Sequence, residues 1–343
     1  MNKSDFNPND IGVPNGNYFG FPYSPDESKV LILPVPWDVT TSYGAGTSNG
    51  PKAILDASVQ LDFYDFDVEN AWKIGHGTLP FPKEIFALNS ELRPTAEKII
   101  DHLEQGNSPE TPKIKELLNK INQASEKLNA YVFEQSNKYL TQNKLIALVG
   151  GDHSTPLGLI NAVCEKYDEI GILHIDAHAD LRNAYEGFEF SHASIMFNAL
   201  KNKSVSRLVQ VGIRDVCDEE VSLTKTDSRI VLFDDNQLKE NQFNGISWKE
   251  QCDQIISNLP ENVYLSFDID GLNPSYCPNT GTPVPGGLDF DQALYLIKQL
   301  VNHNKKIVSF DLNEVSPGND EWDANVGARL LYKISNLMYK SHQ

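Results

Sequence analysis

The chain has 343 residues, of which 40% are hydrophobic and 22% are charged, and its formal net charge is −18 at pH 7. So acidic a chain is a poor partner for nucleic acid or for an anionic membrane surface, and we expect neither. No apolar run approaches the roughly 18 residues of a membrane helix. Because the four cysteines form no C-x-x-C pair and the polar N-terminus is unlike a signal peptide, we expect a cytoplasmic protein with reduced thiols.

We expect one domain, residues 1–343, that opens with an Asn-, Pro- and Gly-rich arm over 1–28. Seven short apolar runs follow, mostly separated by stretches long enough for a helix. Residues 88–142 predict a helical elaboration of the same domain. This alternation indicates an α/β protein with a mainly parallel sheet. The predicted strands span 29–37, 144–151, 171–180, 207–214, 228–235, 262–270 and 306–315.

Polar side chains gather at the ends of four of these strands, at 152–153, 176–180, 268–270 and 311–314. Ligands of parallel sheets bind beyond the carboxyl ends of the strands, so this is where we expect the functional site. The segment LHIDAHAD places Asp176, His178 and Asp180 at alternate positions. On an extended chain such residues point to one side and can converge. Solvated polar strand ends are the alternative interpretation of each segment taken alone.

Two more segments add metal-type ligands. SFDID contributes Asp268 and Asp270, which would repel each other unless a cation lay between them, and GGDHS contributes His153. Carboxylate and imidazole ligands suit Mn²⁺ and also accept Ni²⁺, Co²⁺ or Fe²⁺. Two divalent cations would balance the four aspartates. The sequence therefore predicts a two-metal site, with Mn²⁺ as the first choice and Ni²⁺ as the alternative.

The segments GGDHS, DAHADLR, SFDIDGLNP, TGTPVPGG and DLNEVSP together resemble the ureohydrolase (arginase/agmatinase) superfamily, and the resemblance extends over about residues 29–340. It implies a three-layer α/β/α arginase-type fold with two bound metal ions. By resemblance, Asp176 and Asp268 bridge the two ions. The implied ligands of one ion are His153, Asp176, Asp180 and Asp268, and those of the other are Asp176, His178, Asp268 and Asp270.

The resemblance also implies a reaction. His192 matches the family's proton-shuttle histidine, and Glu314 matches the glutamate that pairs with the guanidinium group. A metal-bridging hydroxide would attack the guanidino carbon and release urea with an amine or ammonia. The family commonly forms trimers or hexamers, so we expect a homo-oligomer. We expect His174 and Asp311 to support the ligands rather than bind metal.

The substrate is less constrained. The pattern DAHADLR…YEG…SHA is closer to agmatinases than to arginases, which favours agmatine-like or small guanidino compounds, including guanidine itself. Guanidino acids, as in guanidinobutyrase or guanidinopropionase, and formiminoglutamate are the alternative substrates, since Arg182 could meet a carboxylate. A non-catalytic homologue is the alternative that is not an enzyme. Candidate substrate contacts are Arg182, Asn183, Glu186, Thr282 and Trp322, the last of which could narrow the pocket.

Overall fold

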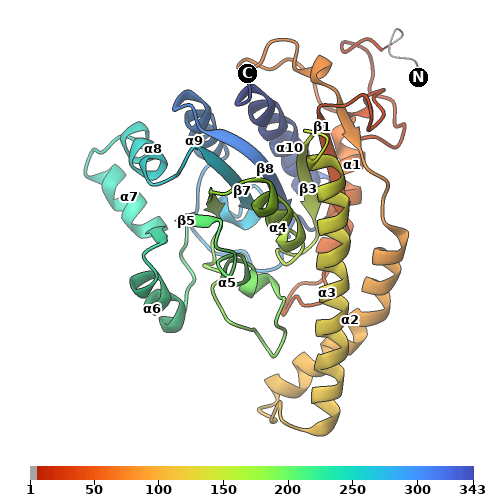
Figure 1. The fold of residues 1–343 in the computed structure, drawn as a ribbon, viewed down its shortest axis with the longest axis vertical. Coiled ribbons are helices and arrows are strands. Elements are labelled where there is room, and N and C mark those ends of the chain that lie inside the picture. Colours follow the sequence, from red (N-terminus) through yellow and green to blue (C-terminus); the bar gives the residue numbers. More distant parts are fainter. Residues whose placement is uncertain (1–5) are drawn as a thin grey trace.

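The computed structural model describes residues 6–343 and contains one central sheet (Figure 1). Its eight strands are all parallel and lie in the order β2-β1-β3-β8-β7-β4-β5-β6. The predicted α/β fold is therefore confirmed. The strands are β1 (Val30–Val35), β2 (His76–Thr78), β3 (Leu145–Gly150), β4 (Ile170–Ile175), β5 (Val205–Val211), β6 (Ile230–Phe233), β7 (Asn262–Asp268) and β8 (Lys306–Asn313).

Helices cover both faces of the sheet, which gives the three layers. Alternate residues of a strand enter opposite cores: Leu31 packs with α2, α3 and α4, whereas Ile32 packs with α1, α9 and α10. Burial on both faces explains why the strands read as nearly continuous apolar runs. The helices are α1 (Gly50–Ser58), α2 (Lys83–Glu104), α3 (Pro112–Leu140), α4 (Leu157–Lys166), α5 (Ile195–Ala199), α6 (Asp218–Thr226), α7 (Asp235–Phe243), α8 (Trp248–Ser257), α9 (Phe290–Asn302) and α10 (Trp322–Lys340).

All seven predicted strands are present, but β2 was not predicted. It has only three residues and pairs with the edge of β1, so it offers too short a pattern to be recognised. Within residues 6–343, none of the helices has both the length and the apolar composition of a membrane span.

The predicted helical elaboration is a hairpin of two long helices, α2 and α3. The hairpin extends well beyond the sheet in Figure 1. Thr111 caps the start of α3 by accepting a hydrogen bond from the Ile114 amide. Pro112 occupies the first helical position, where a backbone N–H group would have no partner within the helix, so its absence in proline costs nothing. The buried stripe of α3 begins at Ile114.

Much of the predicted N-terminal arm is packed against the domain, although residues 1–5 lie outside the described part. Phe19 and Phe21 are buried. Their rings lie 5.1 and 6.3 Å from the Tyr332 ring of α10 and 5.7 Å from the imidazole of His76. The segment is therefore anchored to β2 and α10 through an aromatic cluster that encloses His76.

His76 should make the fold sensitive to acid. Burial lowers the pKa of its imidazole from 6.5 to about 3. The folded protein keeps His76 neutral, whereas the unfolded chain takes up a proton below about pH 6.5, so stability falls as the pH drops from 6.5 toward 3. The loss should reach about 1 kcal/mol at pH 5.5. Urea unfolding of the wild type and of His76→Phe at pH 7.5 and 5.5 measures it. An equal loss in both proteins would refute the role of His76.

Candidate metal centre

The four strand ends that carry the polar segments are neighbours. Strands β3, β8, β7 and β4 are adjacent in the sheet, so their carboxyl ends meet at one edge. The Gly-Gly turn after β3 lets the chain pass close to the end of β1, since a Cβ on Gly151 would lie 2.0 Å from the Trp37 carbonyl oxygen. His153 thereby lies directly over the ends of β7 and β4.

The DAHAD segment does not continue the strand. Strand β4 ends at Ile175, and Asp180 has a left-handed backbone with φ of 54°. The expectation of an extended chain with strict alternation is therefore wrong after Ile175. The chain turns instead because the Asp176 carboxylate accepts the amide hydrogen of His178, at 2.6 Å. As a result, Asp176 and Asp180 face His153, whereas His178 turns toward Asp270.

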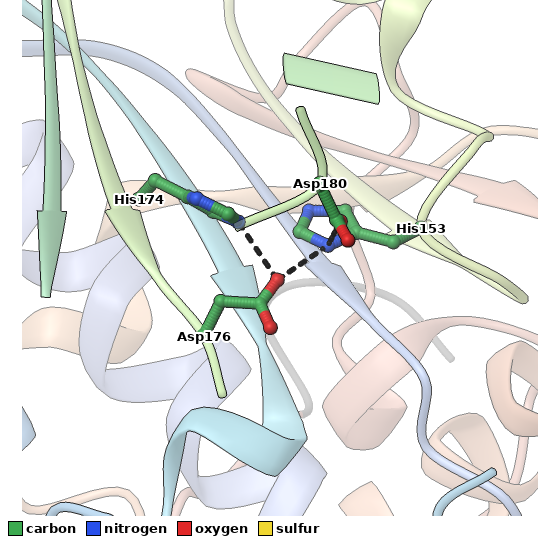
Figure 2. Close-up of side chains that lie close together, drawn as sticks. All are labelled: His153, His174, Asp176 and Asp180. Atoms are coloured by element: carbon green, nitrogen blue, oxygen red, sulfur yellow. Dashed lines mark hydrogen bonds and ion pairs between the residues drawn. The ribbon is translucent and has the colours of Figure 1, made fainter. Parts of the chain in front are cut away.

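The first cluster centres on Nδ1 of His153. This nitrogen lies 3.0 Å from Asp176 Oδ2, 3.2 Å from Asp180 Oδ2 and 3.2 Å from Asp268 Oδ2, and all four side chains are buried. Figure 2 shows the imidazoles of His153 and His174 both directed at the Asp176 carboxylate, with Asp180 beside His153. Three buried carboxylates thus converge on one imidazole nitrogen.

The far side of the His153 ring is held by a hydrogen-bonded chain. The Ser266 hydroxyl donates to Asp311 Oδ1 at 3.0 Å, so it accepts the hydrogen on His153 Nε2 at 2.8 Å. This arrangement turns Nδ1 toward the carboxylates. Such outer partners orient the imidazole ligands of metal sites.

His174 supports the cluster in another way. The Gln210 amide group donates to the Ala179 carbonyl at 2.7 Å and to His174 Nδ1 at 3.0 Å. Nε2 of His174 therefore carries its hydrogen and donates it to Asp176 Oδ2 at 2.7 Å. Although His174 lies within the cluster, this nitrogen is already occupied, which fits the supporting role expected from the sequence.

The second cluster adjoins the first through Asp176. Nδ1 of His178 lies 3.0 Å from Asp270 Oδ2 and 3.6 Å from Asp176 Oδ1. The other oxygen of Asp270 accepts the amide hydrogen of Ala177 at 3.0 Å. Asp268 joins the two groups, because its Oδ1 accepts the Asp270 amide hydrogen at 2.8 Å while its Oδ2 faces His153.

Arg214, which follows β5, stabilises the backbone of the second cluster. Its guanidinium group donates to the carbonyl oxygens of Gly212, Asp270, Leu272 and Val284 at 2.7–3.2 Å. The backbone at Asp270 is thus tied to the end of β5, two strands away in the sheet, and to the loop that follows β7.

A cavity of about 240 Å³ opens onto the clusters, with His178, Asp180 and His192 in its lining. Its wall comes from loops that follow β1, β4, β5 and β7. The other lining residues are Ser42, Tyr43, Arg182, Tyr185, Ala193, Asp215, Val216, Cys217, Glu220 and Thr282.

Comparison with known proteins identifies the family. The sequence profile of the arginase family matches residues 28–336, about nine tenths of the chain. The chain belongs to the arginase family. It is 31% identical to the N(1)-aminopropylagmatine ureohydrolase of Thermus thermophilus over 91% of both chains, and 32% identical to the agmatinase of Citrobacter koseri over 89% of this chain and 87% of that one. This arginase-family protein is thus a hydrolase that acts on C–N bonds of linear amidines.

Solved structures show the same fold. The agmatine ureohydrolase of Thermoplasma volcanium superposes with a TM-score of 0.69 at 23% identity, over 99% of this chain and 97% of that one. The proclavaminate amidino hydrolase of Streptomyces clavuligerus superposes with a TM-score of 0.71 at 21% identity, over 97% of this chain and 100% of that one. The three-layer arginase-type architecture predicted from the sequence is confirmed.

The electrostatics of this arginase-family site call for a cation. Burial, with the charges of Asp270 and Asp176, raises the pKa of Asp268 well above its usual value, and burial with Asp176 raises that of Asp180 to about 6. Burial also opposes a charge on His153, yet Asp176, Asp180 and Asp268 hold its pKa well above 6.5. The raised pKa of His153 therefore favours a positive charge between its ring and the carboxylates, either a proton on Nδ1 or a metal ion. The donor set of imidazole and carboxylate fits divalent ions such as Mn²⁺.

Glu314 lies against His153, whereas His192 lies in the cavity wall. Oε1 of the buried Glu314 accepts the amide hydrogen of His153 at 2.9 Å. Burial and the nearby Asp152 raise the pKa of the Glu314 carboxyl well above its usual value. His192 begins the short 3-10 helix η5 (His192–Ser194) at the cavity wall, and burial with the charges of His178 and His153 lowers its pKa to about 4.

The structure separates the candidate substrate contacts. Arg182 and Thr282 line the cavity. Asn183 is exposed, and Glu186 accepts a hydrogen bond from the Ser42 hydroxyl at 3.2 Å. Trp322 lies at the start of α10, 47% exposed, and its indole donates to the Ser275 carbonyl. The structure therefore does not bring Asn183, Glu186 or Trp322 to the cavity wall.

Sequence reasoning missed several residues that shape the site. Gln210, Arg214 and Ser266 were passed over, although each is a polar residue within or just after an apolar strand, and such a residue needs a partner when buried. That signal could have identified them. Ser42 and Tyr43 also reach the cavity, although they lie more than a hundred residues before the metal-type motifs and are not metal-type ligands themselves.

Proposed function

We propose that the two adjoining clusters hold two divalent cations and that the protein hydrolyses a guanidino C–N bond, releasing urea with an amine or ammonia. The observation that carries this proposal is the pair of adjoining carboxylate–imidazole groups, which have Asp176 in common and meet at Asp268. The proposed ligands of the first ion are His153, Asp176, Asp180 and Asp268, and those of the second are Asp176, His178, Asp268 and Asp270. The two ions would be Mn²⁺, with Ni²⁺ as the alternative.

Bound divalent cations would lower the pKa of a water molecule and so supply a nucleophile at neutral pH. Glu314 would hold the planar guanidinium group by charge-assisted hydrogen bonds and fix its orientation. The lowered pKa keeps the His192 imidazole neutral, so it can accept a proton at the cavity wall and pass it to the leaving amine. The loops around the cavity would exclude bulk water from the reaction.

The cavity favours a small substrate with a short tail. Its volume of about 240 Å³ lies below the range of typical drug-sized pockets. The carboxylate of Asp215 is 70% exposed in the cavity lining and would suit an amine-bearing tail such as that of agmatine. We therefore place agmatine-like and small guanidino compounds first, guanidine among them.

Guanidino acids and formiminoglutamate form the second candidate class because of Arg182. Its guanidinium group lies over the Tyr185 ring at 4.8 Å and 3.9 Å from Glu220. Glu220 already accepts the amide hydrogens of Leu181 and Cys217. Arg182 therefore retains donors that could meet a carboxylate of the substrate.

A turnover panel tests the proposal. Protein loaded with Mn²⁺ or Ni²⁺ is incubated with agmatine, guanidine, guanidinobutyrate, guanidinopropionate, arginine and formiminoglutamate, and urea, ammonia and formamide are measured. We expect the highest kcat/KM for agmatine or a smaller guanidino compound. Absence of all three products from every substrate, with two metal ions bound, would leave the alternative of a non-catalytic homologue.

The oligomeric state is a separate part of the proposal. Light scattering of the purified protein tests the expected trimer or hexamer.

A further inference from the structure

The hairpin of α2 and α3 contacts the two loops whose side chains form much of the cavity wall. The first, the 38–48 loop, follows β1 and contributes Ser42 and Tyr43 to the lining. The second, the 182–190 loop, follows the DAHAD segment and contributes Arg182 and Tyr185. Neither helix contributes a residue to the two clusters or to the cavity lining.

Helix α2 fixes the 38–48 loop through two side chains. The amide of Asn89 both accepts from the Asp38 amide hydrogen at 2.7 Å and donates to Asp38 Oδ1 at 2.9 Å. The other oxygen of Asp38 accepts the amide hydrogens of Gly46 and Ser48, which closes the loop on itself. All of these groups are buried or partly buried, so the hydrogen bonds are not exposed to competition from bulk water.

Arg93 of α2 holds the same loop one helical turn later. Its Nη1 lies 2.5 Å from the Thr41 carbonyl, 2.7 Å from the Thr41 hydroxyl and 3.2 Å from the carbonyls of Asp38 and Val39. The side chain is 14% exposed. The Arg93 guanidinium group thus donates to three loop carbonyls that come directly before Ser42 and Tyr43 in the chain.

Helix α3 fixes the 182–190 loop. The Asn122 amide donates to the Gly187 carbonyl at 3.2 Å and accepts the Glu189 amide hydrogen at 3.0 Å. Gly187 has a φ of 81°, a backbone conformation that favours glycine, and a Cβ there would lie 2.8 Å from the Leu118 side chain of α3. The two loops also meet each other, through the Ser42 hydroxyl and Glu186.

We propose that Arg93 and Asn122 are positioning residues for substrate binding and that the α2–α3 hairpin sets the shape of the substrate mouth. The proposal rests on the proposed function, since the cavity must take the guanidino substrate. Both loops depend on this one hairpin, so a small change in its backbone contacts moves Tyr43 and Tyr185 together. The metal-type ligands lie at or just after the ends of β3, β4 and β7, outside both loops, and stay in place.

The test compares Arg93→Met and Asn122→Ala with a matched control, Lys120→Met. Lys120 of α3 pairs with Glu91 of α2 at 3.0 Å and contacts neither loop. For the two variants we expect kcat/KM on the best guanidino substrate to fall by roughly 10- to 100-fold, mainly through KM, with unchanged metal content. Hydrogen exchange should become faster in peptides covering 38–48 for Arg93→Met and 182–190 for Asn122→Ala. Lys120→Met should behave like the wild type.

Conservative variants keep the test decisive if either protein folds poorly. Arg93→Lys retains a cation that can donate to Thr41, and Asn122→Asp retains the acceptor for the Glu189 amide hydrogen. KM should therefore rise less in these two variants than in Arg93→Met and Asn122→Ala. An unchanged KM with faster loop exchange would overturn the role in substrate binding. Unchanged exchange in both loops would overturn the positioning itself. These outcomes differ from failure of the proposed function, in which the wild type hydrolyses no guanidino compound.

Discussion

Replacing Asp268 with alanine is expected to abolish both tight binding of the paired metal ions and turnover. Asp268 lies between the clusters, with one oxygen 3.2 Å from His153 Nδ1 and the other on the Asp270 amide hydrogen. Loss of an outer-shell partner typically costs 10- to 100-fold in metal affinity or activity, and loss of a shared ligand should exceed this. Metal content after dialysis, measured by elemental analysis, and urea release from the best substrate record the two effects.

Asp268→Asn separates ligand loss from misfolding. Burial and the charges of Asp270 and Asp176 disfavour the Asp268 carboxylate in the metal-free protein. A neutral amide should therefore unfold at the same temperature as the wild type or higher in the presence of a chelator, but gain less from added Mn²⁺. Asp253→Ala, on the surface of α8, is the control. Full turnover of Asp268→Ala would refute the shared-ligand assignment.

The sheet could be predicted because its physical signal is local. Residues such as Leu31 and Ile32 are buried on opposite faces, so the run around them is apolar throughout, and this pattern needs no knowledge of the partner strands. The adjacency of β3, β8, β7 and β4 could not be read from the pattern. It depends on which strands pair, and pairing is decided by contacts between residues far apart in the chain.

The site was predictable in composition but not in conformation. The residue types of Asp176, His178 and Asp180 indicated metal binding, but the left-handed backbone at Asp180 was not predicted. The carbonyl of Asp180 accepts the amide hydrogens of Met196 and Phe197, which lie beyond the segment. The cavity wall was harder still. Tyr43 reaches it because Asn89 and Arg93 hold its loop from a separate helix, an arrangement that leaves no periodicity in the sequence.

Glu314→Gln is expected to lower kcat/KM by roughly 30- to 5,000-fold while leaving metal content intact, because truncating one partner of a buried charge pair costs about 2–5 kcal/mol. The glutamine keeps an oxygen that can accept the His153 amide hydrogen, so the fold around the clusters should persist. Only the negative charge is lost. A decrease in metal content equal to the decrease in kcat/KM would contradict the proposed role in substrate binding.

The pH dependence gives this prediction a second readout. Burial and Asp152 raise the pKa of the Glu314 carboxyl, so its protonated form persists to a higher pH than usual. That form does not attract a guanidinium cation, so KM should fall as the pH rises through the carboxyl's pKa and then level off. Substrate binding should also release a proton, which calorimetry in buffers of different ionisation enthalpy detects.

Glu314→Gln should lose both the pH dependence of KM and the proton release. Glu261→Gln, at the surface pair with Lys306, should keep both. Retention of the proton release in Glu314→Gln would assign it to another carboxyl of the site, such as that of Asp152, whose own pKa is raised to about 7 by burial.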